Sequence, residues 1–177
     1  LPVIVMLLGL IFRGIAFEFS TVSNSKKIWN VAFTAGSTVA TFTQGIVLGG
    51  LIQGIKVENN AYAGGPFDWA TPFALFCGLA LCAGYLLLGA TWLVMKTEGV
   101  VADRARAHAK LILLAVLGCM AVISLWTPLA HARIAERWFV LPNILYLWPV
   151  PVITALVAFW LGRALERGRD ITPFLAT

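Results

Sequence analysis

Residues 72–95 read PFALFCGLALCAGYLLLGATWLVM, a long apolar run that contains no charged side chain. A helix needs roughly 20 mostly apolar residues to cross the ~30 Å hydrocarbon core of a bilayer. Pro72 suits the first turn of a helix, where the N–H that proline lacks would have no intrahelical acceptor. The run is therefore predicted to be a membrane-spanning helix.

Similar runs recur along the chain, and we predict an all-α fold, a polytopic transmembrane helical bundle of about five spans in a single domain. The predicted spans are residues 2–19, 31–55, 72–95, 111–127 and 143–162, and residues 171–177 look like the start of a further one. Hydrophobic residues make up 60% of the chain and charged residues 12%, against about 25% charged residues in soluble domains. Because the chain begins inside an apolar run without Met, we expect an internal fragment of a longer protein.

Basic residues gather in alternate connecting segments. Segments 20–30, 96–110 and 163–170 hold Lys26, Lys27, Lys96, Arg104, Arg106, Lys110, Arg163, Arg167 and Arg169, whereas the other two segments hold Lys56, Arg133 and Arg137. The positive-inside rule places the first three segments in the cytoplasm. The net charge of +5 therefore reflects membrane orientation, and we expect no nucleic-acid partner.

Arg13 and Glu18 stand near the cytoplasmic end of the first predicted span. A charge within a spanning helix is costly and indicates function by default, but a long Arg side chain near a helix end can also extend to the interface. Both interpretations of Arg13 stay open at this point. Glu18 lies at the boundary, either solvated or paired with Arg13 or Lys26.

The second predicted span is unusually polar. Its first half carries Thr34, Ser37, Thr38, Thr41, Thr43 and Gln44, and two G-x-x-x-G pairs follow, Gly45–Gly49 and Gly50–Gly54. Small residues let helix backbones approach, and hydroxyls bond across helices. We interpret the span as a helix-packing surface, with a polar path through the membrane or a subunit contact as the alternative.

Residue types that carry cofactor chemistry are scarce in the spans. His108 and His131 fall in predicted loops, whereas a haem within the bundle needs an axial ligand such as His or Met. Cys77, Cys82 and Cys119 lie in apolar runs and are interpreted as small buried hydrophobes. We therefore expect this segment to bind no cofactor or metal and to catalyse no reaction alone.

Several strings are specific enough to compare with known families. They are Phe12-Arg13-Gly14 with Phe17-Glu18-Phe19, Gly36-Ser37, Gln44 to Gly49, the loop motif Phe67-Asp68-Trp69-Ala70-Thr71-Pro72-Phe73, Gly84 to Leu93, and Lys96-Thr97-Glu98-Gly99. In this order and spacing the chain resembles subunit II of the cytochrome bd-type quinol oxidases, including the cyanide-insensitive branch. The resemblance covers most of the chain and is strongest over residues 7–99.

The resemblance implies a subunit of a prokaryotic inner-membrane complex that oxidises quinol and reduces dioxygen to water. In that family haems b and d belong to the partner, subunit I, and subunit II ligates none. Arg13 matches an intramembrane arginine that faces the partner's haem propionates or a polar path, and Glu18 matches an acidic position. Ser37 and Gln44 are further candidates for a proton or oxygen path, and quinone is a further candidate ligand. A secondary transporter or channel-like protein and a purely structural assembly subunit remain as alternatives.

Overall fold

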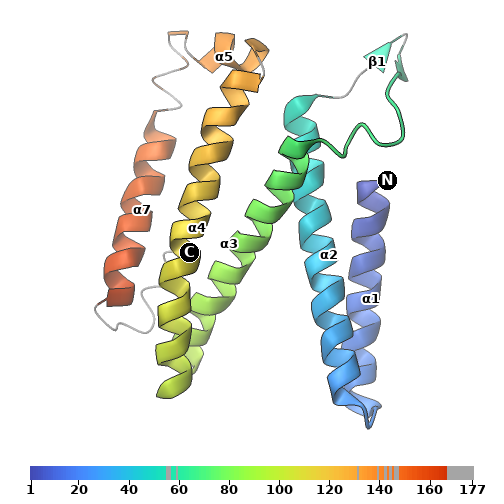
Figure 1. Cartoon of the computed structure of the whole chain (residues 1–177), viewed down its shortest axis with the longest axis vertical. Helices are drawn as coiled ribbons and strands as arrows, with labels where there is room; N and C mark the ends of the chain where they lie inside the picture. Colours follow the sequence, from blue (N-terminus) through green and yellow to red (C-terminus); the bar gives the residue numbers. More distant parts are fainter. Residues whose placement is uncertain are drawn as a thin grey trace. The chain divides into compact units, whose positions relative to one another are not determined.

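The computed structural model describes residues 1–166 except 55, 56, 59, 131, 139, 142, 144, 146 and 147. Its helices are α1 (Pro2–Val22), α2 (Lys26–Gln53), α3 (Pro72–Lys96), α4 (Val100–Ala130), α5 (Ala132–Trp138) and α7 (Pro149–Glu166), shown in Figure 1. Between α2 and α3 lies a small antiparallel hairpin of β1 (Val57–Glu58) and β2 (Ala61–Tyr62). The predicted class, an all-α helical membrane bundle, is confirmed.

Within the described ranges, α1, α2, α3 and α4 are long and apolar enough to cross a membrane, and α7 is a shorter apolar helix. Large apolar side chains stay exposed along these helices, for example Leu8 and Leu114. Exposed apolar surfaces of this kind are compatible with contact to lipid tails, which are as apolar as the side chains themselves. The protein is therefore a multi-pass membrane protein.

The helices extend past the apolar runs into segments expected to be loops. Helix α2 begins at Lys26 rather than at residue 31, and α4 begins at Val100 rather than at residue 111. Residues 102–110 read ADRARAHAK, and Ala, Arg and Lys are strong helix formers. A helix can continue into water with polar side chains. The connections between α1 and α2 and between α3 and α4 are therefore short, residues 23–25 and 97–99.

The segment 128–142 also differs from the expected polar loop. Helix α4 runs through Pro128, and the hydroxyl of Thr127 donates to the carbonyl of Ile123 at 2.7 Å. Helix α5 follows, and α7 begins at Pro149 rather than at residue 143, because proline is favoured at a helix start. The predicted further span at 171–177, together with Arg167 and Arg169, lies outside the described residues.

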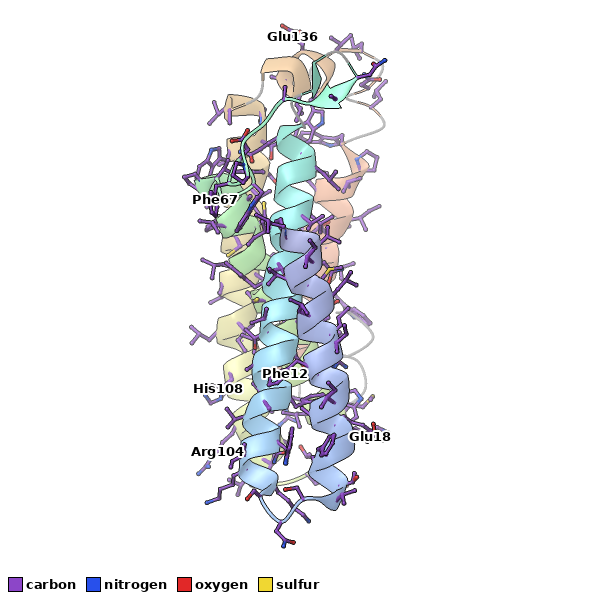
Figure 2. The ribbon with its side chains drawn as sticks, turned by 90° about the vertical axis from the view of Figure 1, so that its right-hand side faces the viewer. Phe12, Glu18, Phe67, Arg104, His108 and Glu136 are labelled. Carbon is purple, nitrogen blue, oxygen red and sulfur yellow. The ribbon has the colours of Figure 1, made fainter. Side chains whose placement is uncertain are left out.

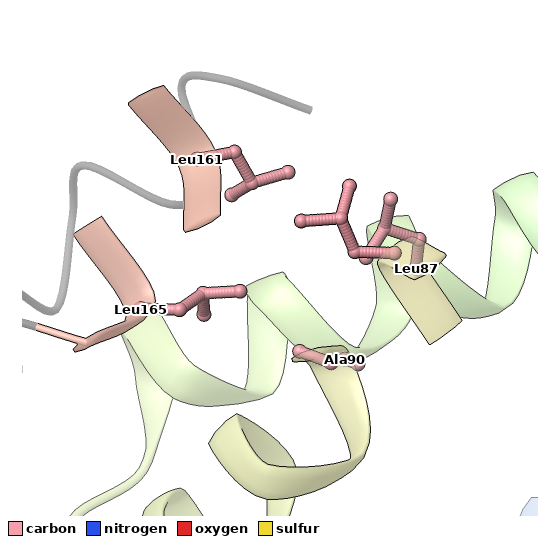
Figure 3. Packing of buried hydrophobic residues seen from close by; sticks show 6 residues of the cluster. Leu87, Ala90, Leu161 and Leu165 are labelled. Atoms are coloured by element: carbon pink, nitrogen blue, oxygen red, sulfur yellow. The ribbon is translucent and has the colours of Figure 1, made fainter. Parts of the chain in front are cut away.

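The chain divides into two compact units, residues 1–82 and 83–177, with α3 running through both. In the second unit α3, α4 and α7 share an apolar core of Leu87, Ala90, Ala109, Leu113, Leu161 and Leu165. Figure 3 shows Leu161 and Leu165 of α7 directed toward Leu87 and Ala90 of α3. The first unit holds α1, α2 and the start of α3, and it carries most of the candidate site residues.

Candidate functional site

Helices α1 and α2 cross at two glycines. A Cβ atom added to Gly9 would lie 3.0 Å from the carbonyl oxygen of Gly36, and one added to Gly36 would lie 2.9 Å from that of Gly9. The same Cβ on Gly36 would lie 3.0 Å from the backbone nitrogen of Arg13. The absence of side chains therefore lets the two backbones touch, and this contact fixes where Arg13 stands beside α2.

Arg13 lies near the middle of α1, level with Gly36. Its Cζ atom lies over the ring of Phe33, 5.2 Å from the ring centroid, and Phe17 contacts the same ring at 6.4 Å between centroids. Phe33 is seven residues into α2, so the guanidinium stands about 10 Å of helix rise from Lys26. Arg13 is otherwise exposed, and within the described ranges no ion pair involves it. The cation thus has one covered face and one open face.

Glu18 lies apart from Arg13. Figure 2 shows its side chain on α1 directed away from α2, and the residue is exposed. Its backbone carbonyl accepts a hydrogen bond from the hydroxyl of Thr21 at 2.7 Å. The structure therefore does not bring the carboxylate of Glu18 to the guanidinium of Arg13.

Ser37 and Gln44 stand on the same stretch of α2 in different environments. The Oγ atom of Ser37 is buried and makes no hydrogen bond, whereas Gln44 is exposed. Gln53, at the end of α2, accepts a hydrogen bond from the hydroxyl of Thr71 at 2.6 Å. That hydroxyl also accepts from the backbone N–H of Ala74 in the first turn of α3, so it ties the two helix ends together.

The first glycine pair of α2 packs on α3. A Cβ on Gly45 would lie 2.6 Å from Cα of Gly78, and one on Gly49 would lie 2.6 Å from Cα of Ala74. Gly50, by contrast, has nothing within 4 Å of such a Cβ. Gly54 caps the C-terminus of α2 with a φ of 86°, a conformation that glycine adopts without strain.

The loop motif forms a turn before α3. The indole Nε1 of Trp69 donates to the carbonyl of Pro66 at 2.7 Å, and the ring of Phe67 contacts that of Trp69 at 6.4 Å. Asp68 is exposed and its backbone N–H bonds to Gly65. Together with the start of α1 and the end of α2, Asp68 and Trp69 line a pocket of 630 Å³.

Lys96 and Glu98 stand at the turn between α3 and α4, and both are exposed. Lys96 lies in the last turn of α3, where a cation complements the helix dipole. Gly99 has a φ of 65° and leads into α4. These residues form a charged helix end.

Two residues of the Arg13 site were missing from the sequence prediction, namely Phe33 and Gly9. A phenylalanine in an apolar span carries no distinguishing signal, since lipid or core contact explains it equally well. Gly9 and Gly36 each gave the signal of a small residue in a span, but pairing them requires the register between α1 and α2.

Comparison with known proteins identifies the family. The model of the family described as "Cytochrome bd terminal oxidase subunit II" matches residues 1–177. The chain belongs to the cytochrome bd oxidase subunit II family. The prediction made from the motifs around Arg13, Asp68 and Lys96 is thereby confirmed at the level of the family.

The relatives that the chain resembles carry names consistent with the subunit II family. Over 131 residues the chain is 30% identical to "Cytochrome bd-I ubiquinol oxidase subunit 2" of Escherichia coli K12, covering 70% of this chain and 35% of the relative. It is 28% identical over 134 residues to "Probable cytochrome oxidase subunit 2" of Haemophilus influenzae, covering 71% and 35%. The "Cytochrome bd ubiquinol oxidase subunit 2" of Bacillus subtilis is 27% identical over 118 residues, covering 64% and 35%. These matches each span about a third of the relative's length.

Proposed function

We propose that this chain forms part of the subunit that does not ligate haem in a bd-type quinol:oxygen oxidoreductase. The complex would oxidise quinol and reduce dioxygen to water in the prokaryotic inner membrane. Membership of the subunit II family over residues 1–177 is the observation that carries this proposal. Two of the relatives are named as ubiquinol oxidase subunits, and these names support quinol as the substrate.

Haems b and d would belong to the partner, subunit I. A haem iron within the membrane needs an axial His, Met, Cys or Tyr. His108 stands among charged residues near the start of α4, with its Nδ1 atom 2.7 Å from the carbonyl oxygen of Arg104. This position does not suit a ligand to an intramembrane haem.

The role proposed for the α1–α2 pair is to present a cation to the partner subunit. Arg13 lies within the apolar helix α1, and the ring of Phe33 covers one face of its guanidinium. A haem propionate or a carboxylate of the partner would offset the desolvation of the guanidinium. Glu18, directed away from α2, would serve a separate polar surface.

The proposed orientation places the turns at residues 23–25 and 97–99 in the cytoplasm. Lys26 and Lys27 follow the first turn, and Lys96, Arg104 and Arg106 flank the second. Two candidate spans, α2 and α3, separate the two turns along the chain, so both turns would lie on the same side of the membrane and the positive-inside rule would apply to them together. The loop with Asp68 and Trp69 would then lie on the outer side.

Purification of the full-length protein from its native membrane tests the proposal. We expect a stable complex with a second membrane subunit, haem absorbance from that subunit, and quinol-dependent oxygen consumption. A stable preparation without haem and without an oxidase partner would contradict it. Solute uptake by the protein reconstituted alone would instead favour the transporter alternative.

A further inference from the structure

Arg13 belongs to a short row of contacts that joins α1 to α2. Its Cζ atom lies 5.2 Å from the centroid of the Phe33 ring. The ring of Phe17 lies 6.4 Å from the same ring, between centroids, and is tilted by 47° against it. Phe33 of α2 therefore contacts two side chains of α1, one that carries a charge and one that is aromatic. Any effect of the Phe17 ring on the charge passes through Phe33.

The spacing along α1 explains why both side chains reach the same residue. Arg13 and Phe17 are four residues apart, which places them one above the other on one face of a helix. Gly9 lies four residues before Arg13 on that face, and its contact with Gly36 holds the two backbones together. The two helices run in opposite directions, so later residues of α1 meet earlier residues of α2. Phe33, three residues before Gly36, therefore lies where Arg13 and Phe17 both reach it.

The Phe33 ring sets the depth of the guanidinium in the helix pair. The backbone nitrogen of Arg13 is level with Gly36, whereas its Cζ atom lies over Phe33, about 4.5 Å of helix rise nearer to the start of α2. An arginine side chain is long enough to extend further along a helix toward the interface. The contact with Phe33 holds the guanidinium at this level instead.

The plane of the Phe33 ring decides whether the ring attracts the cation. An aromatic ring carries negative potential on its faces and positive potential at its edge, so it attracts a guanidinium that stands over its face. Rotation of the ring about its χ2 angle would turn the edge toward Arg13. The Phe17 ring lies beside Phe33 within the range of aromatic pairs, about 4.5–7 Å between centroids, and it opposes that rotation.

A second aromatic pair lies nearer to the turn between the two helices. The rings of Phe19 in α1 and Trp29 in α2 stack with 5.1 Å between centroids and 22° between planes. Phe17 and Phe19 are both largely exposed, by 66% and 52%, and each contacts an aromatic ring of α2. They differ in their partners, because Phe33 contacts Arg13, whereas Trp29 lies about one turn nearer to the start of α2. Phe19 is therefore a matched control for Phe17.

We propose that Phe17 is a positioning residue for Arg13: by fixing the plane of the Phe33 ring, it holds the guanidinium at one depth and leaves its other face open. This inference rests on the proposed function, because it takes Arg13 to be a charge that the oxidase uses. It does not depend on which group meets the open face. The alternative is that Phe17, like Phe19, only joins the two helices. The two roles differ in whether loss of the Phe17 ring acts through Arg13.

Matched substitutions in the full-length complex test the role of the Phe17 ring. Phe17→Leu is expected to lower quinol-dependent oxygen consumption per haem by about two- to fourfold, because the Phe33 ring remains but its plane is no longer fixed. Phe17→Tyr keeps the ring and is expected to restore the rate. Phe19→Leu removes an aromatic contact of the same kind and is expected to leave the rate unchanged. An unchanged rate in Phe17→Leu, or equal losses in Phe17→Leu and Phe19→Leu, overturns the proposal.

A double-mutant cycle shows whether the effect passes through Arg13. If Phe17 positions the guanidinium, Phe17→Leu should lower the rate per haem no further once Arg13 is replaced by Ala, because residues that act through one contact are not additive. If Arg13→Ala does not assemble, Arg13→Gln provides a background of similar length without the charge. The same two- to fourfold loss on either background would show that Phe17 acts independently of Arg13, and it would overturn the proposal.

Thermal unfolding of the same variants distinguishes positioning from packing. Phe17→Leu and Phe19→Leu both remove a largely exposed ring, so they leave no large cavity and are expected to lower the unfolding midpoint by similar small amounts. Activity should nevertheless fall only in Phe17→Leu. A midpoint that falls in Phe17→Leu alone, together with its activity, would attribute the loss to a loosened helix pair and overturn the positioning role.

The outcomes separate this inference from the proposed function. If Arg13→Ala lowers turnover and Phe17→Leu behaves like Phe19→Leu, the positioning role fails and the proposed function stands. If Arg13→Ala leaves the turnover and spectra of an active oxidase unchanged, the roles of Arg13 and Phe17 both fail, and the chain remains an oxidase subunit. Absence of a haem-bearing partner from the unsubstituted preparation overturns the proposed function and this inference together.

Discussion

The guanidinium of Arg13 lies over the ring of Phe33, with 5.2 Å between Cζ and the ring centroid. The two residues come from adjacent helices whose backbones touch at Gly9 and Gly36. An aromatic face attracts a cation by about 0.5–2 kcal/mol, which is less than the cost of placing an Arg at the centre of a spanning helix. Phe33 therefore orients the guanidinium without neutralising it, and the proposal is that an anion of the partner subunit meets its open face.

Substitution of Arg13 by Ala is expected to lower quinol oxidase turnover at least tenfold or to reduce the haem content of the complex. Arg13→Lys keeps the charge but loses the planar fork that pairs with two carboxylate oxygens, so we expect a milder loss. Oxygen consumption and absorbance spectra of the purified complex measure both effects. Turnover and spectra unchanged in the Ala variant would mean that Arg13 merely extends toward the interface.

Phe33→Leu separates the orienting role from the charge. The substitution keeps an apolar side chain of similar bulk and removes the cation–π contact, so we expect turnover to fall several-fold, less than in Arg13→Ala. Phe12→Leu, on the apolar flank of α1, is the matched control and is expected to leave turnover unchanged. An equal effect of the two substitutions would show that the ring of Phe33 acts only by filling space.

Gly36→Ala is expected to destabilise the protein, because the new Cβ would lie 2.9 Å from the carbonyl oxygen of Gly9. Backbone atoms must then move apart, and overpacking of this kind costs about 1–3 kcal/mol. Thermal unfolding in detergent should show a lowered midpoint. Gly14→Ala, on the same helix pair but with nothing within 4 Å of the added Cβ, should leave the midpoint unchanged or raised.

The two glycine pairs of α2 are expected to respond differently to alanine. A Cβ on Gly45 would lie 2.6 Å from Cα of Gly78, whereas one on Gly50 would meet nothing within 4 Å. Gly45→Ala should therefore lower the unfolding midpoint, and Gly50→Ala should raise it slightly, since Ala favours helix over Gly by about 1 kcal/mol. Equal loss in both variants would indicate that Gly50 packs against another helix in the complex.

The sequence was sufficient for the class of fold because apolar length decides which helices can cross a membrane. It was insufficient for helix ends, since Arg104, Arg106 and Lys110 stand in α4 although they are polar. The candidate site was predicted only in part. Arg13 is conspicuous as a charge in an apolar run, but its contact with Phe33 depends on the register of α1 against α2, which Gly9 and Gly36 set through space.

The proposed orientation of the chain gives a prediction that does not depend on catalysis. In a background with Cys77, Cys82 and Cys119 replaced by Ala, a cysteine at Ser25 or Glu98 should react with an impermeant maleimide only after the cytoplasmic side is opened. A cysteine at Ala63, which is exposed before α3, should react in intact cells from which the outer membrane has been removed. The physical reason is that the positive-inside rule favours the cytoplasmic side for the turns that carry Lys26, Lys27 and Lys96. Labelling of Glu98→Cys in intact cells would contradict the proposed orientation and would indicate the opposite one.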